Sequence, residues 1–249
     1  MISLNSVTSL LKVIQNSDPK TAATLTKLLN VKVLESLGGN KYLLDIGGKQ
    51  LTAFSEQKLT PFEHYFARFE AAKDTKPALS HLIKIPKLFA KLPLLQLSDL
   101  FLEPKELARL LGSKEAIQNF KNTLLKELAA SHSKEHFQTL TPFLLSLHQN
   151  ILSVPLHFYE SFALLQFKKR YNKKTKKSFL DFYAFFTHLG PISGMISERE
   201  VKINVAFDET KEYLEHLSGE VGYPVHIEVS EAITPLYEAK SERVLDIVT

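Results

Sequence analysis

Residues 189–207 read LGPISGMISEREVKINVAF, and this stretch decides the fold expected for the C-terminal part of the chain. Apolar and polar residues alternate on both sides of a charged turn, which is the period of two typical of half-buried strands. The opposite, polar face of the second strand carries Lys202 and Asn204. The stretch contains no catalytic pattern, so we expect it to contact another protein. The residues expected on the apolar face are Ile192, Gly194, Ile196, Val201, Ile203, Val205 and Phe207.

The flanking sequence extends this pair of strands to a unit that covers residues 151–249. Residues 156–167 and residues 179–189 are each expected to form one strand, the second of them dense in aromatic side chains. Asp208 is expected to cap a helix. Residues 225–229 alternate again and are expected to form the last strand. The predicted order is β-β-β-β-α-β, a C-terminal antiparallel β-sheet with one packed helix.

The early part of the chain contains a second group of predicted strands. Residues 31–56 hold two turn patterns, Gly38-Gly39-Asn40 and Gly47-Gly48, which separate three short strands. Residues 65–69 are expected to add a fourth strand. Strands at this spacing predict a small β-barrel-like unit. We expect residues 1–75 to form an N-terminal helix followed by this unit.

Residues 76–150 have a different character and predict a helical segment. Pro104 suits the first position of a helix, and Gly112 suits its end. Ser113 is expected to cap the next helix, and Pro142 is expected to break or restart the last one. The three parts together predict an α+β fold class.

The composition limits the classes of function. The 249 residues carry a net charge of +4 and a pI near 9.0, which permits contact with acidic partners. Cysteine is absent, which excludes disulfides, thiolate zinc sites and cysteine nucleophiles. The N-terminus lacks the basic region of a signal peptide, and no apolar run reaches the roughly 18 residues of a membrane helix. We expect a cytoplasmic protein without membrane insertion.

One short pattern matches a catalytic motif. The string HSKEH, residues 132–136, has the H-x-x-E-H spacing of inverted zincins, in which two histidines one helical turn apart bind zinc and the glutamate acts as base. The alternative is a polar helix start with Ser131 and Ser133 as cap residues. The sequence offers no identifiable third carboxylate ligand and no nucleotide-binding or serine-hydrolase pattern. We therefore expect a protein that is not an enzyme and that binds neither a metal ion nor a cofactor.

A dense basic cluster lies between the two strands that precede the opening stretch. It admits three interpretations: a phosphate-binding finger with Tyr171 as a stacking residue, a contact for an acidic protein surface, or a solvated hairpin tip with Asn172 in the turn. The first interpretation gives the alternative function, a nucleic-acid-binding accessory protein. The cluster consists of Lys168, Lys169, Arg170, Lys173, Lys174, Lys176 and Lys177.

The C-terminal pattern resembles the C-terminal domain of flagellar hook-length control proteins (FliK-type). That domain has an apolar strand ending in L-G-x-I, a second strand of the v-x-i-x-f kind, and a helix that opens with acidic and Thr residues. The segment VLESLGGNKYLLDIGGKQLTAFSE also resembles the leading β-unit of shorter relatives in that family. The matching C-terminal positions are Leu189, Gly190, Ile192, Ile203, Val205, Phe207, Thr210, Tyr213 and Leu214.

The resemblance implies a non-catalytic role in flagellar type III export. In that family the C-terminal domain contacts the cytoplasmic switch domain of the export gate (the FlhB-type protein) and changes which substrates are exported. It implies that this chain modulates export specificity or hook assembly in the cytoplasm. Whether the chain is itself exported through the same apparatus stays open. The contact surface would be formed or supported by Leu189, Gly190, Ile192, Lys202 and Asn204.

One departure from the family pattern concerns the middle of the chain. Hook-length control proteins carry a long Pro/Ser/Gln-rich ruler, whereas residues 76–150 here are helix-like. A single unbroken helix of that length would span roughly 110 Å, and Gly112 and Pro142 indicate that the segment folds back. We therefore expect a shorter relative without the ruler, acting on the export gate or on a paralogue of the gate.

Overall fold

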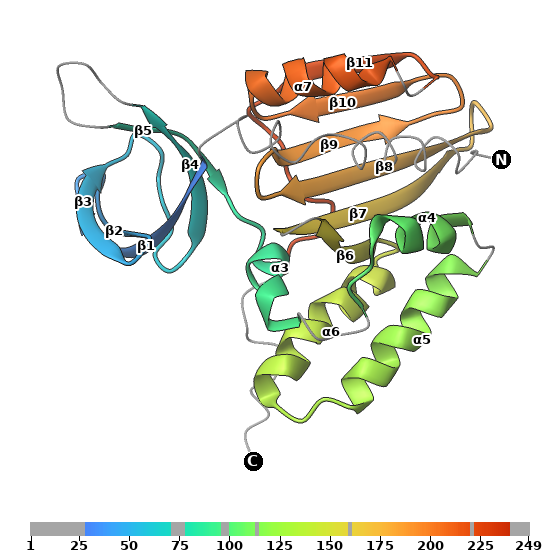
Figure 1. The fold of residues 1–249 in the computed structure, drawn as a ribbon, viewed down its shortest axis with the longest axis horizontal. Coiled ribbons are helices and arrows are strands. Elements are labelled where there is room, and N and C mark those ends of the chain that lie inside the picture. Colours follow the sequence, from blue (N-terminus) through green and yellow to red (C-terminus); the bar gives the residue numbers. More distant parts are fainter. Residues whose placement is uncertain are drawn as a thin grey trace.

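The computed structural model describes residues 28–70, 78–95, 100–112, 115–158, 161–219 and 222–239. These residues form a mixed α+β fold with two β-sheets and five α-helices (Figure 1). The α+β fold class is therefore confirmed. The predicted N-terminal helix lies outside the described residues.

The first sheet confirms the four early strands and adds a fifth. Its strand order is β3-β2-β1-β4-β5, and all neighbours are antiparallel. The sheet curls (Figure 1), but within the described residues β3 and β5 do not pair, so it is open and not a barrel. The strands are β1 Leu28–Gly38, β2 Lys41–Ile46, β3 Lys49–Phe54, β4 His64–Glu70 and β5 Ala78–Lys84.

Strand β5 corrects the prediction that residues 76–150 are helical from their start. It pairs with β4 through an irregular register between Phe66 and Arg68, and His81 within it has φ of +51°. Such irregularity weakens the period of two by which a strand is recognised in a sequence. The first sheet therefore continues to Lys84 before the helices begin.

The second sheet contains six strands in the same order in space as in the chain. Residues 156–167, predicted as one strand, belong to two strands of a hairpin in which His157 pairs with Phe162. The sheet was predicted to be antiparallel throughout, and this is wrong for its last pair: β11 runs parallel to β10, to which the α7 crossover (Asp208–Ser218) connects it, so the sheet is mixed. The strands are β6 Leu152–Phe158, β7 Ser161–Asn172, β8 Lys177–Phe186, β9 Gly190–Ile196, β10 Val201–Val205 and β11 Val225–Val229.

The helices of the middle segment lie beside the β6 end of the second sheet (Figure 1). The predicted start at Pro104 and end at Gly112 are confirmed, whereas Ser113 lies outside the described residues. Pro142 lies inside α6, so the predicted break there is wrong. The helices are α3 Lys87–Ala90, the 3₁₀ helix η1 Leu92–Leu95, α4 Pro104–Gly112, α5 Ala116–Ala129 and α6 Lys134–His148.

Packing explains why α6 continues through Pro142. A proline inside a helix removes one backbone hydrogen bond and costs about 3 kcal/mol. Leu140 and Phe143 flank Pro142 and are both fully buried in the main core. Burying two such side chains contributes roughly 3–6 kcal/mol, which offsets that cost.

The two sheets meet at a cluster of aromatic side chains. Phe66 of β4 stacks on Phe185 of β8 with ring centroids 5.4 Å apart, and Phe89 of α3 lies 4.6 Å from the same ring. Phe185 is fully buried. The strand β4 thus contributes to the main core as well as to the small core inside the first sheet.

Candidate protein interaction surface

The residues that carry the L-G-x-I pattern meet the start of α7 at one buried junction. The Thr210 hydroxyl donates a hydrogen bond of 2.9 Å to the carbonyl oxygen of Leu189. Gly190 lies under the ring of Phe207 with φ of +72°, and a Cβ added there would lie 2.6 Å from that ring. Phe207, not Asp208, is the N-cap residue of α7, so the predicted Asp208 cap is wrong. Local packing therefore explains the pattern. Gly190 leaves room for the ring of Phe207, and the hydroxyl of Thr210 bonds the carbonyl of Leu189.

The predicted contact residues separate into buried and exposed groups. Leu189 and Ile192 are each 4% exposed and Gly190 is buried, so these three hold β9 against α7 from inside. Lys202 is exposed and Asn204 is half-buried, and both lie on the other face of β10. A partner can therefore touch Lys202 and Asn204 directly, while the buried residues support the strands that present them.

The parallel register of β11 enlarges this polar face. It places His226 beside Lys202 and Glu228 beside Asn204. The sequence shows that 226 and 228 alternate with apolar residues, but only the register reveals that they adjoin β10. We call this surface, Glu200, Lys202, Asn204, His226 and Glu228, the polar β10–β11 face.

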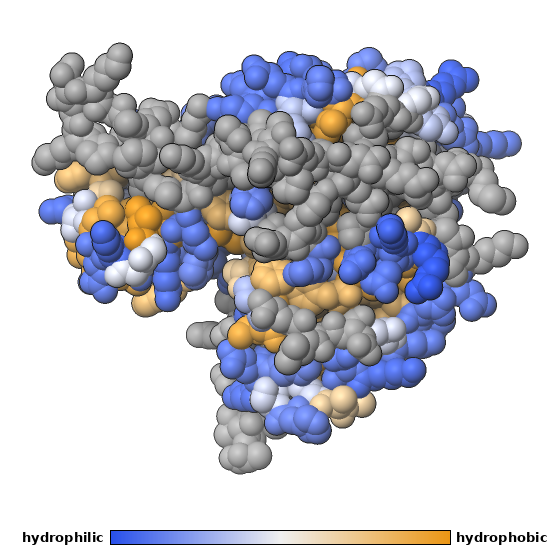
Figure 2. Space-filling model, in the orientation of Figure 1, coloured by the Kyte–Doolittle hydropathy of each residue, from blue (hydrophilic) through white to orange (hydrophobic). Residues whose placement is uncertain are grey.

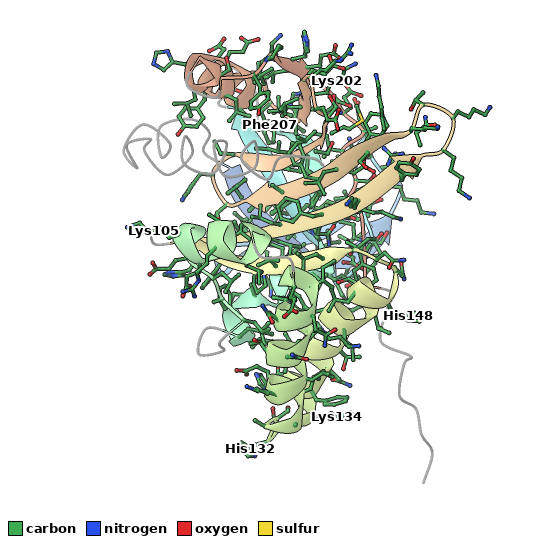
Figure 3. The ribbon with its side chains drawn as sticks, turned by 90° about the vertical axis from the view of Figure 1, so that its right-hand side faces the viewer. Lys105, His132, Lys134, His148, Lys202 and Phe207 are labelled. Atoms are coloured by element: carbon green, nitrogen blue, oxygen red, sulfur yellow. The ribbon has the colours of Figure 1, made fainter. Side chains whose placement is uncertain are left out.

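On the polar β10–β11 face, the carboxylate of Glu200 lies close to two other side chains. Glu200 lies 3.3 Å from the Lys202 ammonium and 3.6 Å from Nε2 of His226. Ion pairs this exposed contribute little to stability, typically below about 1 kcal/mol. Because these contacts are weak, Glu200, Lys202 and His226 can give up their contacts with one another and bind groups of another protein instead. In Figure 3 Lys202 lies at the opposite end of the molecule from His132 and Lys134.

The two edges of the second sheet differ. The β6 edge is covered at one point, where Leu102 forms a parallel bridge with Leu156 and exchanges backbone hydrogen bonds with Pro155 and His157. No described strand pairs with the outer side of β11. Figure 2 shows hydrophilic residues over α7, which packs on β10 and β11. Within the part of the chain that the structure describes, β11 is therefore the sheet edge that no strand or bridge covers.

The basic cluster forms the tip of the β7–β8 hairpin. Pairing with β6 ends at Phe167 and pairing with β9 ends at Leu180, so the hairpin continues beyond its neighbours as a two-stranded ribbon. Asn172 accepts backbone hydrogen bonds from Lys174 and Thr175 and holds the turn. Arg170 pairs with Asp181. Tyr171 is 58% exposed.

The HSKEH string marks the start of α6. Ser133 is the N-cap and its hydroxyl accepts the His136 backbone N–H at 3.1 Å, as the alternative interpretation predicted. Because the helix begins at Lys134, His132 precedes it and the two histidines do not share one helical face. Nδ1 of His136 lies 3.2 Å from the Ser131 hydroxyl. Among the described residues, no group of three or more metal-ligating side chains is placed to hold a metal ion.

The segment after β11 is anchored to β7, the strand next to the β6 edge of the sheet. The side-chain amide of Gln166, fully buried on β7, bonds both the N–H and the carbonyl of Tyr237 at 3.1 and 2.9 Å. Next to it, the Glu238 carboxylate accepts the Lys87 backbone N–H at 3.1 Å. Loss of water around the carboxylate raises the pKa of Glu238, although the residue as a whole is exposed, and the Lys87 hydrogen bond and the nearby Lys84 charge act in the lowering direction. Sequence reasoning missed this anchor, because it joins residues 71 positions apart.

This raised pKa gives a pH prediction. A carboxyl whose pKa is raised in the folded chain lowers the free energy of unfolding when it is ionised. This loss of stability is present at neutral pH, shrinks as the pH falls through the folded pKa, and is gone below the ordinary pKa of 4.5. Glu238→Gln, which keeps an acceptor for Lys87, should therefore be more stable than the wild type at pH 7 and equal to it below pH 4.5. Urea unfolding across this range measures the difference. Glu231→Gln, an exposed carboxylate of the same segment, is the control, and a variant less stable at both pH values would contradict the assignment.

None of the helices within the described ranges combines the length and the apolar character that crossing a membrane requires. Comparison of the chain with protein-family models, with curated protein sequences and with solved structures finds no match.

Proposed function

We propose that this chain is a non-catalytic protein–protein interaction module of the flagellar type III export system. It modulates export specificity or hook assembly by binding the cytoplasmic switch domain of the export gate, or of a gate paralogue, through the polar β10–β11 face. The observation that carries the proposal is the buried junction of Leu189, Gly190, Phe207 and Thr210. These four residues are among the nine positions on which the resemblance rests, and the junction gives each of them a packing role.

The polar β10–β11 face supports an interaction role. Lys202, Asn204, His226 and Glu228 come from two adjacent strands and project from one side of a rigid sheet. Side chains presented by a sheet keep their relative positions, which favours selective recognition of a charged partner. Their mixed charge suits a partner surface with both acidic and basic groups.

The test is direct binding of the full chain to the purified cytoplasmic domain of the FlhB-type protein from the same genome. Lys202→Glu should weaken binding about tenfold, because it reverses a charge at the centre of the proposed surface. Lys105→Glu, the same change at an exposed position on α4, should leave the affinity unchanged. Calorimetry or surface plasmon resonance measures both.

Two results would overturn this proposal. One is the absence of binding by the wild-type chain. The other is binding that responds equally to Lys202→Glu and to Lys105→Glu, which would place the contact elsewhere.

The ribbon at the β7–β8 tip favours a second candidate function, nucleic-acid binding. A projecting two-stranded ribbon can enter a groove of a duplex, and exposed lysines can neutralise phosphates. Tyr171 is available to stack on a base. This function predicts binding to an oligonucleotide that weakens steeply with salt, and further weakening in Lys173→Glu/Lys174→Glu. Binding that is insensitive to salt and to this variant would exclude it.

A further inference from the structure

The outer edge of β11 offers a regular row of backbone hydrogen-bonding groups. The Val201 N–H bonds the Pro224 carbonyl, and the Ser230 N–H bonds the Val205 carbonyl. Bonding groups alternate along a strand, so the even-numbered residues of β11 face β10 and the odd-numbered ones face outward. The N–H and C=O groups of Val225, Ile227 and Val229 therefore point away from the sheet, where no described strand meets them.

This row is complementary to itself. In an antiparallel pairing of two β11 strands centred on Ile227, Val225 of one copy lies opposite Val229 of the other, and Ile227 lies opposite Ile227. All three outward-facing residues then occupy hydrogen-bonded positions. A register shifted by one residue would place inward-facing groups in those positions and lose the bonds.

The side chains fit the same register. His226 of one copy lies opposite Glu228 of the other, twice across the two-fold axis, at the closer non-hydrogen-bonded positions. His226 already lies 3.6 Å from Glu200 on its inner side, so its imidazole would lie between two carboxylates. Glu228 is exposed and has no ion-pair partner among the described residues. On the other face, Val229 is 42% exposed and would be covered by Val225 of the second copy.

We propose that two copies of this chain associate through their β11 edges, antiparallel and centred on Ile227, to form one continuous twelve-stranded sheet. The occupant is a second copy because the VHIEV strand matches its own reverse in backbone hydrogen bonding and in the pairing of an imidazole with a carboxylate. Such an isologous pairing closes on itself and leaves no further β11 edge for filaments. The two polar β10–β11 faces become one surface on the same side of the sheet.

Mass measurement on the full chain tests this proposal. A pairing of five residues a side is a small interface, so we expect a dissociation constant on the order of 10–100 µM. Light scattering should show the mass rising from 28.2 kDa towards twice that value as the concentration increases. Glu228→Lys, which faces His226 in the second copy, should weaken the dimer about tenfold because each change acts twice. His226→Glu/Glu228→Lys places a carboxylate opposite an ammonium and should recover most of the loss.

A second pair of variants tests the backbone bonds. Val229→Pro removes an outward N–H without removing a bond to β10, a substitution that an edge strand tolerates. It should weaken the dimer on the order of 100-fold, because two hydrogen bonds are lost. Val229→Ala keeps the N–H and should retain most of the affinity. Circular dichroism checks that each variant is folded.

Amide exchange locates the contact. As the concentration rises, the amides of Val225, Ile227 and Val229 should become protected, while those of His226 and Glu228 are protected at every concentration.

Three outcomes would overturn the proposal. They are a monomeric mass at about 1 mM, a dimer that Glu228→Lys and Val229→Pro leave unchanged, and a dimer without concentration-dependent protection of the odd-numbered amides. The experiment contains no export-gate protein, so its failure leaves the proposed function standing, and the reverse also holds.

Discussion

Ile203→Asp should unfold the second sheet and lower the free energy of unfolding by more than about 4 kcal/mol. Ile203 lies on the central part of β10 and is 3% exposed, in contact with the core under α7. The aspartate would lose the apolar packing and would place a carboxylate in the buried core. Urea unfolding followed by circular dichroism measures the loss.

The adjacent residue provides the control for this prediction. Lys202 is exposed on the other face of the same strand, so Lys202→Glu should change stability by less than about 0.5 kcal/mol. An Ile203→Asp variant that unfolds with the wild-type midpoint would show that the faces of β10 have been assigned the wrong way round.

Gly190→Ala should cost about 3 kcal/mol, although it adds a single methyl group. The residue has φ of +72°, where any side chain is strained, and the new Cβ would lie 2.6 Å from the ring of Phe207. Phe207 is 2% exposed and lies edge-on to His81 of β5, so the ring has little room to move. Thermal unfolding should show a lower midpoint.

Gly219→Ala is the matched control. Gly219 ends α7 with φ of −59°, and a Cβ built there meets no atom within 4 Å. Its stability should remain within about 0.5 kcal/mol of the wild type. Equal losses at the two glycines would mean that the packing under Phe207 is not the cause.

The sequence allowed prediction of those features that depend on neighbouring residues. Alternation in residues 201–205 and 225–229 identified β10 and β11, and the glycine turns identified β1 to β3. The polar side of the predicted β10 strand gave Lys202 and Asn204, which lie where a partner can touch them.

Other features depend on residues far apart in the chain and left no local signal. The parallel register that brings His226 beside Lys202 is set by the α7 crossover. The stacking of Phe66 on Phe185 joins two sheets, and the Gln166–Tyr237 bonds join a strand to a later loop. Pro142 was predicted to break a helix because local propensity was considered without the core contacts of Leu140 and Phe143.

The matching of chain order and spatial order in the second sheet has a consequence for synthesis. Each strand from β7 to β11 pairs with the strand made immediately before it, so the sheet can grow one strand at a time as the chain leaves the ribosome. Each step up to β10 closes only a short loop, which keeps its entropic cost low, and the α7 crossover then brings in β11. The first sheet, in contrast, must wait for β4 to close across β1. The β11 edge is completed after the other five strands of this sheet, so a nascent chain would present the proposed association surface only once all of them have been made.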